Sequence, residues 1–302
     1  MSPFPRAHLT LTRYASQGSL PAAMWTPMTR SRVTAALLLA AFLLPVAYAA
    51  FVDHGKMVRW WGGATLLGIW AVQWLLDRRA VARGQGGDPA PGLTLFVEPV
   101  AWLALKWGFR RFLIAAQMSA RPGRVELFGW SSGWRGFLVL PDLVSVRRNL
   151  RHARRLADRL QRQAAEHPGS PIRLVTYSSG GFIALEALRR LPQDVQVDRL
   201  VMLAPTVSPG YDLGPALQRC REAVCVCSKG DFLINGLGAM VFGTNDRRHT
   251  VSAGMLGFDQ RPGDGGGLRH MRWRAADIRR LWFAGHFTVS SVPMLSHLIG
   301  GM

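Results

Sequence analysis

The pattern of apolar and polar residues divides the chain into three parts. Residues 1–31 carry scattered prolines and arginines without a period, which predicts a disordered basic tail. Two long apolar runs follow, at 33–52 and 60–76, and from about residue 120 short apolar runs alternate with helical patterns. Such alternation is typical of a parallel sheet with helices on both faces. We therefore predict an α/β domain over residues 120–302.

The two apolar runs predict a transmembrane helical hairpin over residues 32–79. The first run carries no charge over a length that crosses a bilayer, and the second begins and ends with tryptophans. More arginines flank the hairpin than lie in its loop, which places both ends in the cytoplasm. The favoured prediction is a membrane protein whose following domain faces the cytoplasm. Two alternatives are a secretory signal cleaved near Ala49, which gives a secreted protein, and a pair of buried helices in a soluble protein.

Residues 80–119 predict a linker and then an interfacial helix. Glycines and prolines around Asp88 indicate the linker, and the apolar stretch that follows is interrupted by Glu98, Lys106 and Arg110. Charged side chains are costly inside hydrocarbon and favourable at its surface, so this stretch favours an amphipathic helix lying on the bilayer. The alternative is a helix that packs on the core of the following domain.

Within the α/β domain, the periodicity predicts one long amphipathic helix at 143–164 and a series of short strands. The strands are expected at 125–128, 137–140, 172–175, 200–203, 224–227 and 281–283. Active sites of parallel sheets form at the carboxyl ends of the strands. Residues that directly follow these strands are therefore the candidates for chemistry.

The segment 171–190 reads as a strand, a tight Ser/Gly turn and a helix, which is the order that an exposed nucleophilic serine requires. The positions two before and two after that serine must be small, because the backbone passes close to its neighbours there. Ser178 meets this condition with Thr176 and Gly180, whereas Ser179 has a tyrosine at the first position. A second match to Gly-x-Ser-x-Gly surrounds Ser131, but a strand-like run follows it instead of a helix. Ser178 is the favoured nucleophile, and a non-catalytic turn serine is the alternative.

This segment resembles the nucleophile elbow of the alpha/beta-hydrolase superfamily, with Thr176 in place of the usual first glycine. The resemblance covers about residues 123–300 and implies a serine, an acid and a histidine in that chain order, from loops after successive strands. Asp231 follows the strand that ends at Cys227, and His286 follows the run 281–283 near the carboxyl terminus. The resemblance therefore implies a triad of Ser178, Asp231 and His286.

Several other residues complete or compete with this assignment. The backbone N–H groups of Ser179 and of Trp130 or Ser131 are the expected donors to an oxyanion. Residues 232–270 are the expected cover of the site. The weaker candidates are Asp246 and Asp212 for the acid, and His297, His249 and His270 for the base.

The charge and the cysteines limit the partners. With 37 Lys and Arg against 18 Asp and Glu, the net charge of +19 predicts attraction to polyanions. The arginine-rich stretch 147–162 keeps its apolar stripe and has no nucleic-acid fold signature, so an anionic lipid surface is favoured over nucleic acid. Cys220, Cys225 and Cys227 lie too close in one short segment to favour a disulfide framework or a zinc site. We read them as small buried residues in a reducing compartment, and we expect no metal and no cofactor.

Together these patterns predict a basic, membrane-tethered serine hydrolase. It would cleave a carboxylic ester, or a thioester or amide, through an acyl-enzyme on Ser178, with a small-molecule or lipid ester as substrate. One alternative is a catalytically inactive membrane scaffold with the hydrolase fold. The observation that supports it is Thr176 at the position where the elbow usually has glycine. The other is an acyltransferase, in which a second alcohol resolves the same intermediate.

Overall fold

The computed structural model describes residues 57–84, 87–101, 105–119, 123–131, 139–259 and 267–300. The chain divides into two compact units, residues 1–70 and 71–302, and helix α2 (Met57–Gly84) runs through the division. The predicted basic tail, the first predicted membrane span with its alternative cleavage site at Ala49, and the glycine-rich part of the predicted cover lie outside the described residues.

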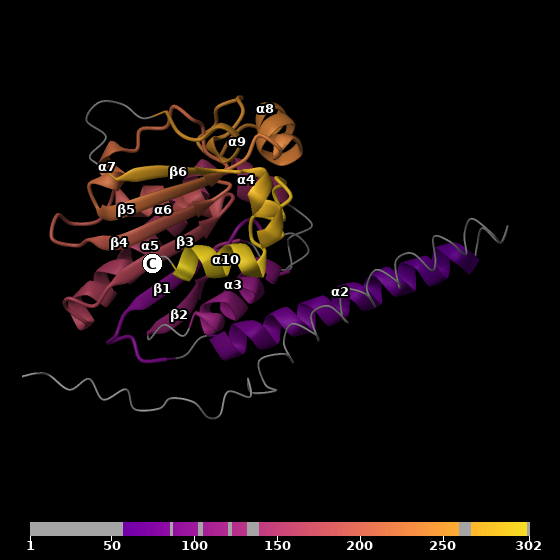
Figure 1. Cartoon of the computed structure of the whole chain (residues 1–302), viewed down its shortest axis with the longest axis horizontal. Helices are drawn as coiled ribbons and strands as arrows, with labels where there is room; N and C mark the ends of the chain where they lie inside the picture. Colours follow the sequence, from indigo (N-terminus) through magenta and orange to yellow (C-terminus); the bar gives the residue numbers. More distant parts are fainter. Residues whose placement is uncertain are drawn as a thin grey trace, which may run out of the picture. The chain divides into compact units, whose positions relative to one another are not determined.

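The second unit is built on a six-stranded sheet in the order β2-β1-β3-β4-β5-β6 (Figure 1). Every pair of neighbouring strands is parallel, so the predicted fold class is confirmed at the level of a parallel α/β sheet. The strands are β1 (Leu93–Val97), β2 (Arg124–Phe128), β3 (Ile172–Tyr177), β4 (Val197–Leu203), β5 (Cys220–Cys227) and β6 (Leu268–Arg272).

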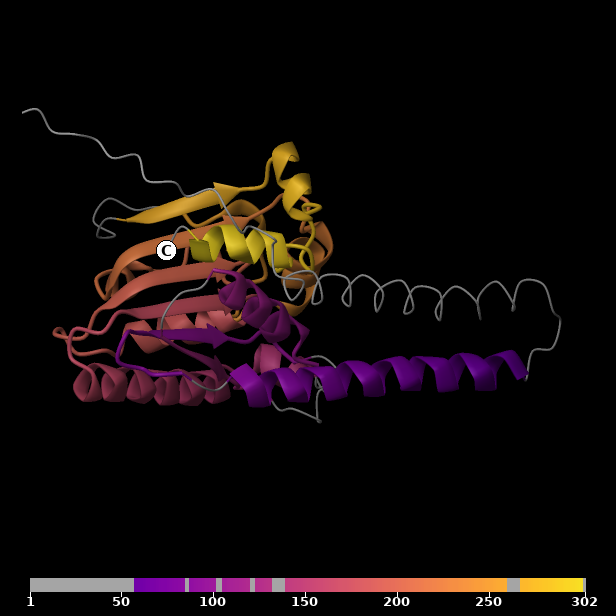
Figure 2. The same cartoon turned by 60° about the horizontal axis from the view of Figure 1, so that its bottom comes forward.

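Helices cover both faces of the sheet, and each face has its own apolar core (Figures 1 and 2). Because side chains alternate along a strand, Leu174 of β3 packs into one core and Val175 into the other. Helices α5 and α6 cover the first face, and α3 and α10 pack against each other on the second. The helices of this unit are α3 (Trp107–Met118), α4 (Val139–Val144), α5 (Val146–Glu166), α6 (Gly180–Leu188), α7 (Gly214–Leu217), η4 (Phe232–Gly238), α8 (Ala239–Phe242), α9 (Ala253–Leu256), η5 (Ala275–Arg280) and α10 (Val292–Gly300).

Strand β1 corrects the prediction of a linker and interfacial helix at 80–119. Leu93, Leu95, Phe96 and Val97 are all buried, because β1 lies between β2 and β3 and is covered on both faces. A short continuous apolar run is what a central parallel strand requires. The predicted interfacial helix exists only from Trp107, as α3, and its buried face contributes to the second core. The α/β unit therefore begins well before the predicted boundary at residue 120.

Two other predicted strands are wrong. Of the run 137–140, the described residues 139–140 already belong to helix α4, whose first turn contains Asp142, a favourable place for a carboxylate. The run 281–283 is not a strand, because Leu281 and Ala284 have φ angles of 57° and 60° that break extended structure. The last strand is β6, which sequence analysis placed in the cover. Its residues are mostly polar because β6 lies at the edge of the sheet.

The second predicted membrane span, residues 60–76, is helical as expected and lies within α2. Among the described helices, however, none combines the length and the apolarity needed to cross a bilayer. The predicted crossing at 60–76 therefore finds no support. Near the carboxyl end of α2, the buried carboxylate of Asp77 accepts a hydrogen bond from the backbone of Lys106 and pairs with Arg110 at 3.3 Å.

Candidate active site

The turn between β3 and α6 holds Ser178 in a strained conformation. Its φ of 53° lies in the left-handed region, which residues with a side chain rarely adopt. Backbone bonds fix this geometry: Ser178 N donates to Leu203 O at 2.8 Å, and Gly181 N donates to Ser178 O at 3.0 Å. The serine side chain thus stands at the carboxyl end of β3, as the predicted strand, turn and helix require.

Gly180 explains why this turn needs a small residue two positions after the serine. A Cβ atom at Gly180 would lie 2.5 Å from Val97 O and 2.6 Å from Glu98 O, both on or directly after β1. No side chain fits at these distances without moving the backbone. Thr176, two positions before the serine, is fully buried, so a threonine is accommodated where the family usually has glycine.

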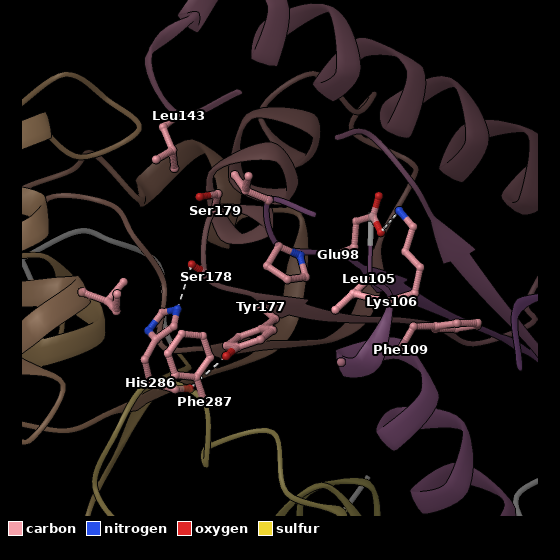
Figure 3. A pocket seen from close by; sticks show the side chains of 14 residues that line it. Glu98, Leu105, Lys106, Phe109, Leu143, Tyr177, Ser178, Ser179, His286 and Phe287 are labelled. Atoms are coloured by element: carbon pink, nitrogen blue, oxygen red, sulfur yellow. Dashed lines mark hydrogen bonds and ion pairs between the residues drawn. The ribbon is translucent and has the colours of Figure 1, made fainter. Parts of the chain in front are cut away.

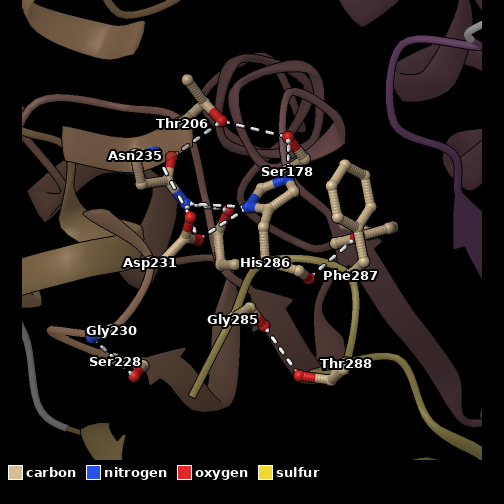
Figure 4. Close-up of polar contacts among 12 residues, drawn as sticks. Ser178, Thr206, Ser228, Gly230, Asp231, Asn235, Gly285, His286, Phe287 and Thr288 are labelled. Carbon is tan, nitrogen blue, oxygen red and sulfur yellow. Dashed lines mark hydrogen bonds and ion pairs between the residues drawn. The ribbon is translucent and has the colours of Figure 1, made fainter. Parts of the chain in front are cut away.

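Three side chains predicted from the sequence meet at hydrogen-bonding distance (Figure 4). His286 Nε2 lies 3.1 Å from Ser178 Oγ, and His286 Nδ1 lies 2.7 Å from Asp231 Oδ2. All three residues are buried to more than nine tenths of their surface. They come from the ends of β3 and β5 and from the loop before α10, so the sheet brings together residues more than 100 positions apart.

Two further residues, which the sequence analysis missed, close this chain of contacts into a ring. Thr206 Oγ1 lies 3.1 Å from Ser178 Oγ and donates to Asn235 Oδ1 at 3.1 Å. Asn235 Nδ2 donates in turn to Asp231 Oδ2 at 2.6 Å. Asn235 is completely buried on the π-helix η4, four residues after Asp231. The four-residue spacing was the one signal available in the sequence.

The ring restricts where the protons lie. Two acceptors lie next to Asn235 Nδ2, namely Asp231 Oδ2 and the carbonyl of Ala204 at 3.2 Å, so the amide nitrogen must face them. Asn235 Oδ1 then faces Thr206, whose single hydroxyl proton is used for that bond. It follows that Thr206 Oγ1 accepts from Ser178, and the serine proton has two acceptors at the same distance.

A cavity of about 380 Å³ opens beside Ser178 and His286 (Figure 3). Its volume falls within the range of small-molecule sites. Ser178, Ser179 and His286 contribute polar atoms at one end, and Glu98 and Lys106 contribute an ion pair to the wall. The rest of the lining is mainly apolar and includes Val100, Leu105, Phe109, Leu143, Ile234 and Phe287.

The loop after β1, rather than Trp130, lines the cavity next to Ser179. The chain adds β2 on one side of β1 and β3 on the other, so the strand order reverses between β1 and β3, where open sheets bind ligands. Glu98, Pro99 and Val100 follow β1 and line the cavity together with Ser179. Trp130 follows the edge strand β2 and does not line the cavity. Its buried indole instead donates to Glu98 O at 2.6 Å and so holds this loop.

Glu98 is a buried carboxylate in the cavity wall. It pairs with Lys106, and burial raises the pKa of the Glu98 carboxyl against the lowering effect of that lysine. Tyr177 lies under the base: its ring stacks on His286 at 5.3 Å between centroids, and its hydroxyl donates to His286 O at 2.9 Å. Burial also raises the pKa of Tyr177, so the phenol remains protonated and can donate.

The weaker candidates lie elsewhere. Ser131 Oγ donates to Asp142 Oδ2 at 2.7 Å, so its hydroxyl is part of a structural contact between β2 and α4. Asp246 accepts from Ser208, and Asp212 pairs with Arg189 at 3.6 Å. The three other candidate histidines bind backbone or lie on α10: His249 contacts Met240 O, His270 contacts Phe258 N, and His297 lies near the end of α10.

The cysteines are free and buried, as predicted. In the part of the chain that the structure describes, no group of His, Cys, Asp or Glu side chains could hold a metal ion.

Comparisons with known proteins add the following. No family model matches the chain, and no curated protein sequence matches it. Among solved structures, a carboxylesterase of Bacillus subtilis, CesB (YbfK), is similar to this chain with 10% identity and a TM-score of 0.37. The match covers 77% of this chain and 95% of that one. The parallel sheet is consistent with an alpha/beta-hydrolase fold.

Proposed function

We propose that the protein is a serine hydrolase that cleaves carboxylic esters with apolar acyl groups through an acyl-enzyme on Ser178. The observation that carries the proposal is the continuous contact from Ser178 Oγ through His286 to Asp231, at 3.1 Å and 2.7 Å, beside an apolar cavity. Serine is a weak nucleophile, and this arrangement supplies the base and the carboxylate that activate it.

In the proposed reaction, Ser178 Oγ attacks the ester carbonyl while His286 Nε2 takes the serine proton. The Asp231 carboxylate accepts a hydrogen bond from His286 Nδ1–H and so stabilises the imidazolium that forms. The leaving alcohol departs with the proton from Nε2. A water molecule then attacks the acyl-enzyme while His286 Nε2 takes one of its protons, and His286 returns that proton to Ser178 Oγ as the acid leaves.

The developing oxyanion needs backbone donors. Ser179 N, directly after the serine and at the start of α6, supports one such role. For the second we propose Val100 N in place of Trp130, since Pro99 carries no N–H and Glu98 N already donates to Phe128 O. Membrane tethering by residues 33–52 and a cytoplasmic location of this domain remain predictions.

A fluorophosphonate probe tests the proposal, because it reacts with activated serines. We expect one covalent adduct, mapped to the peptide that contains Ser178, together with hydrolysis of a water-soluble p-nitrophenyl ester. Ser178→Ala should lose both signals, while Ser131→Ala should keep the adduct, although Ser131 has the better match to Gly-x-Ser-x-Gly. A folded protein that is neither labelled nor active would refute the proposal. Labelling at Ser131 would show that the assignment of the nucleophile to Ser178 is wrong.

A further inference from the structure

Large apolar side chains that face solvent lie in two segments, and each segment contributes one residue, Ile234 or Phe287, to the cavity lining. We name this set the mouth patch. It comes from η4, α8 and the loop around His286, and consists of Phe232, Leu233, Ile234, Leu237, Met240, Val241, Phe242, Phe283 and Phe287. Leu233 is 73% exposed, and most of the others are about half exposed. Single exposed apolar residues are ordinary, but a group of this size marks a surface that contacts something apolar.

The two segments of the mouth patch meet at the triad. Asp231 directly precedes the first segment, and His286 lies in the second, with 2.7 Å between their side chains. A Cβ atom on Gly230 would lie 2.5 Å from Ala284 Cβ, so the two backbones are in contact there. Ile234 and Phe287 belong both to the patch and to the cavity lining. The apolar surface therefore continues from solvent into the cavity.

The charges around the mouth patch have one sign. Lys229, Arg247, Arg248 and Arg279 are exposed beside it, and Arg247 Nη1 donates to Phe242 O at 3.2 Å at the end of α8. In the segments 232–256 and 278–300 the only acidic residue is Asp246, whose carboxylate is bound to Ser208. An apolar surface with a cationic border complements a bilayer of anionic lipids, since the apolar side chains enter the interface while the arginines meet the headgroups.

We propose that the mouth patch docks on an anionic phospholipid surface, so that the cavity takes its ester directly from the membrane. The inference rests on the proposed hydrolase function for the substrate, but the docking itself does not. A docked mouth lets the acyl chain pass from the bilayer along Ile234 and Phe287 to Ser178 without crossing water. The substrate class is then a lipid ester in the membrane.

Site-specific fluorescence on the full chain tests the docking. The three native cysteines are buried, and burial raises the pKa of the Cys220 thiol to about 12, so an introduced surface cysteine is labelled selectively. Leu233→Cys carries an environment-sensitive nitrobenzoxadiazole dye, and Gln193→Cys is the matched control. Gln193 is exposed before β4, at the opposite end of the strands from the site. A tether elsewhere in the chain does not bring residue 193 into the bilayer.

We expect the dye at position 233 to shift to shorter wavelength and brighten with phosphatidylglycerol vesicles, less with phosphatidylcholine vesicles, and the dye at 193 to stay unchanged. Arg248→Gln and Arg279→Gln should each weaken the vesicle titration by about fivefold. Three outcomes overturn the proposal. They are an unchanged dye at 233 with both vesicles, an equal response at 193, and a dye at 233 that is already in an apolar environment without vesicles. In the last case, a dependence on protein concentration assigns the patch to a second copy, and its absence assigns it to another segment of the chain.

A kinetic comparison separates docking from catalysis. Leu233→Ser with Val241→Ser should keep kcat/KM for a water-soluble ester and lose about tenfold or more for the same ester in phosphatidylglycerol vesicles. Ser178→Ala should lose hydrolysis of both and keep the dye response at 233. If the double variant of the mouth patch loses kcat/KM equally for both substrates, the docking proposal is contradicted. A normal dye response at position 233 without any hydrolysis contradicts only the hydrolase proposal.

Discussion

Replacement of Asn235 by leucine tests whether the ring of contacts around the triad positions the base. Leucine has nearly the shape of asparagine, so the fully buried site remains filled. The change removes the donor to Asp231 Oδ2 at 2.6 Å and the acceptor of Thr206. It keeps the backbone bond from residue 235 N to Asp231 Oδ1 at 3.3 Å, so apart from His286 at Oδ2 only this backbone N–H still holds the carboxylate.

A hydrogen bond to a charged group contributes about 1.5–3 kcal/mol. If about half of that, about 0.75–1.5 kcal/mol, holds the carboxylate in the orientation that the imidazolium needs, kcat/KM should fall by about four- to tenfold. KM should change little, because Asn235 does not line the cavity.

The assay is kcat/KM for hydrolysis of a water-soluble p-nitrophenyl ester, with unfolding by urea as a parallel measurement. Gln163→Leu is the matched control, since Gln163 is also a buried amide but contacts Pro89 O and Arg159 on α5. It should lose stability without losing kcat/KM. A loss of kcat/KM below twofold in Asn235→Leu, or an equal loss in both variants, would show that the amide supports the fold and not the base.

Three further predictions follow from the same region. Thr206→Val should lower kcat/KM by less than about threefold, because the Thr206 hydroxyl accepts a proton from Ser178 Oγ and donates none to it. It should lower the free energy of unfolding by about 1–3 kcal/mol, because loss of the hydroxyl leaves the buried side-chain carbonyl of Asn235 without its donor. A loss of kcat/KM above tenfold would mean that Thr206 donates to Ser178. Gly180→Ala should cost about 1–3 kcal/mol in urea unfolding through the clash with the backbone after β1, whereas Gly300→Ala, where a Cβ meets nothing within 4 Å, should not destabilise. Burial raises the pKa of Glu98 above its ordinary 4.5, so its contribution to stability is present below that pH and is lost as pH rises through the folded value. The Tm of the native protein minus that of Glu98→Gln should therefore decrease as the pH rises from 4.5 to 8. A Tm difference that does not change with pH would contradict this.

The sequence located the triad because each member follows a strand or a strand-like run. Ser178 and Asp231 come directly after β3 and β5, whose apolar runs are easily recognised. His286 was found for a partly wrong reason, since the run before it is not a strand. The buried Trp282 makes the run 281–283 apolar, and in the sequence this apolar run resembled a strand.

The parts that the sequence did not reveal depend on contacts between distant segments. Strand β1 was merged with α3 because the apolar residues continue past Glu98, so the strand at 125–128 was taken as the first of the sheet. Trp130 was consequently expected at the oxyanion, although its indole supports the loop of Glu98 from behind. Thr206 and Asn235 carry no motif, and only their positions in the folded chain relate them to Ser178 and Asp231.

The central position of β1 also determines where the chain can be cut. A fragment that begins at residue 120 would lack the neighbour that pairs with β3 along residues 172–176. Strand β3, which leads to Ser178, would then offer its unpaired backbone groups at an open edge, which invites association with other chains. Such a fragment is expected to aggregate, while one that begins at Ala71 retains every strand of the sheet.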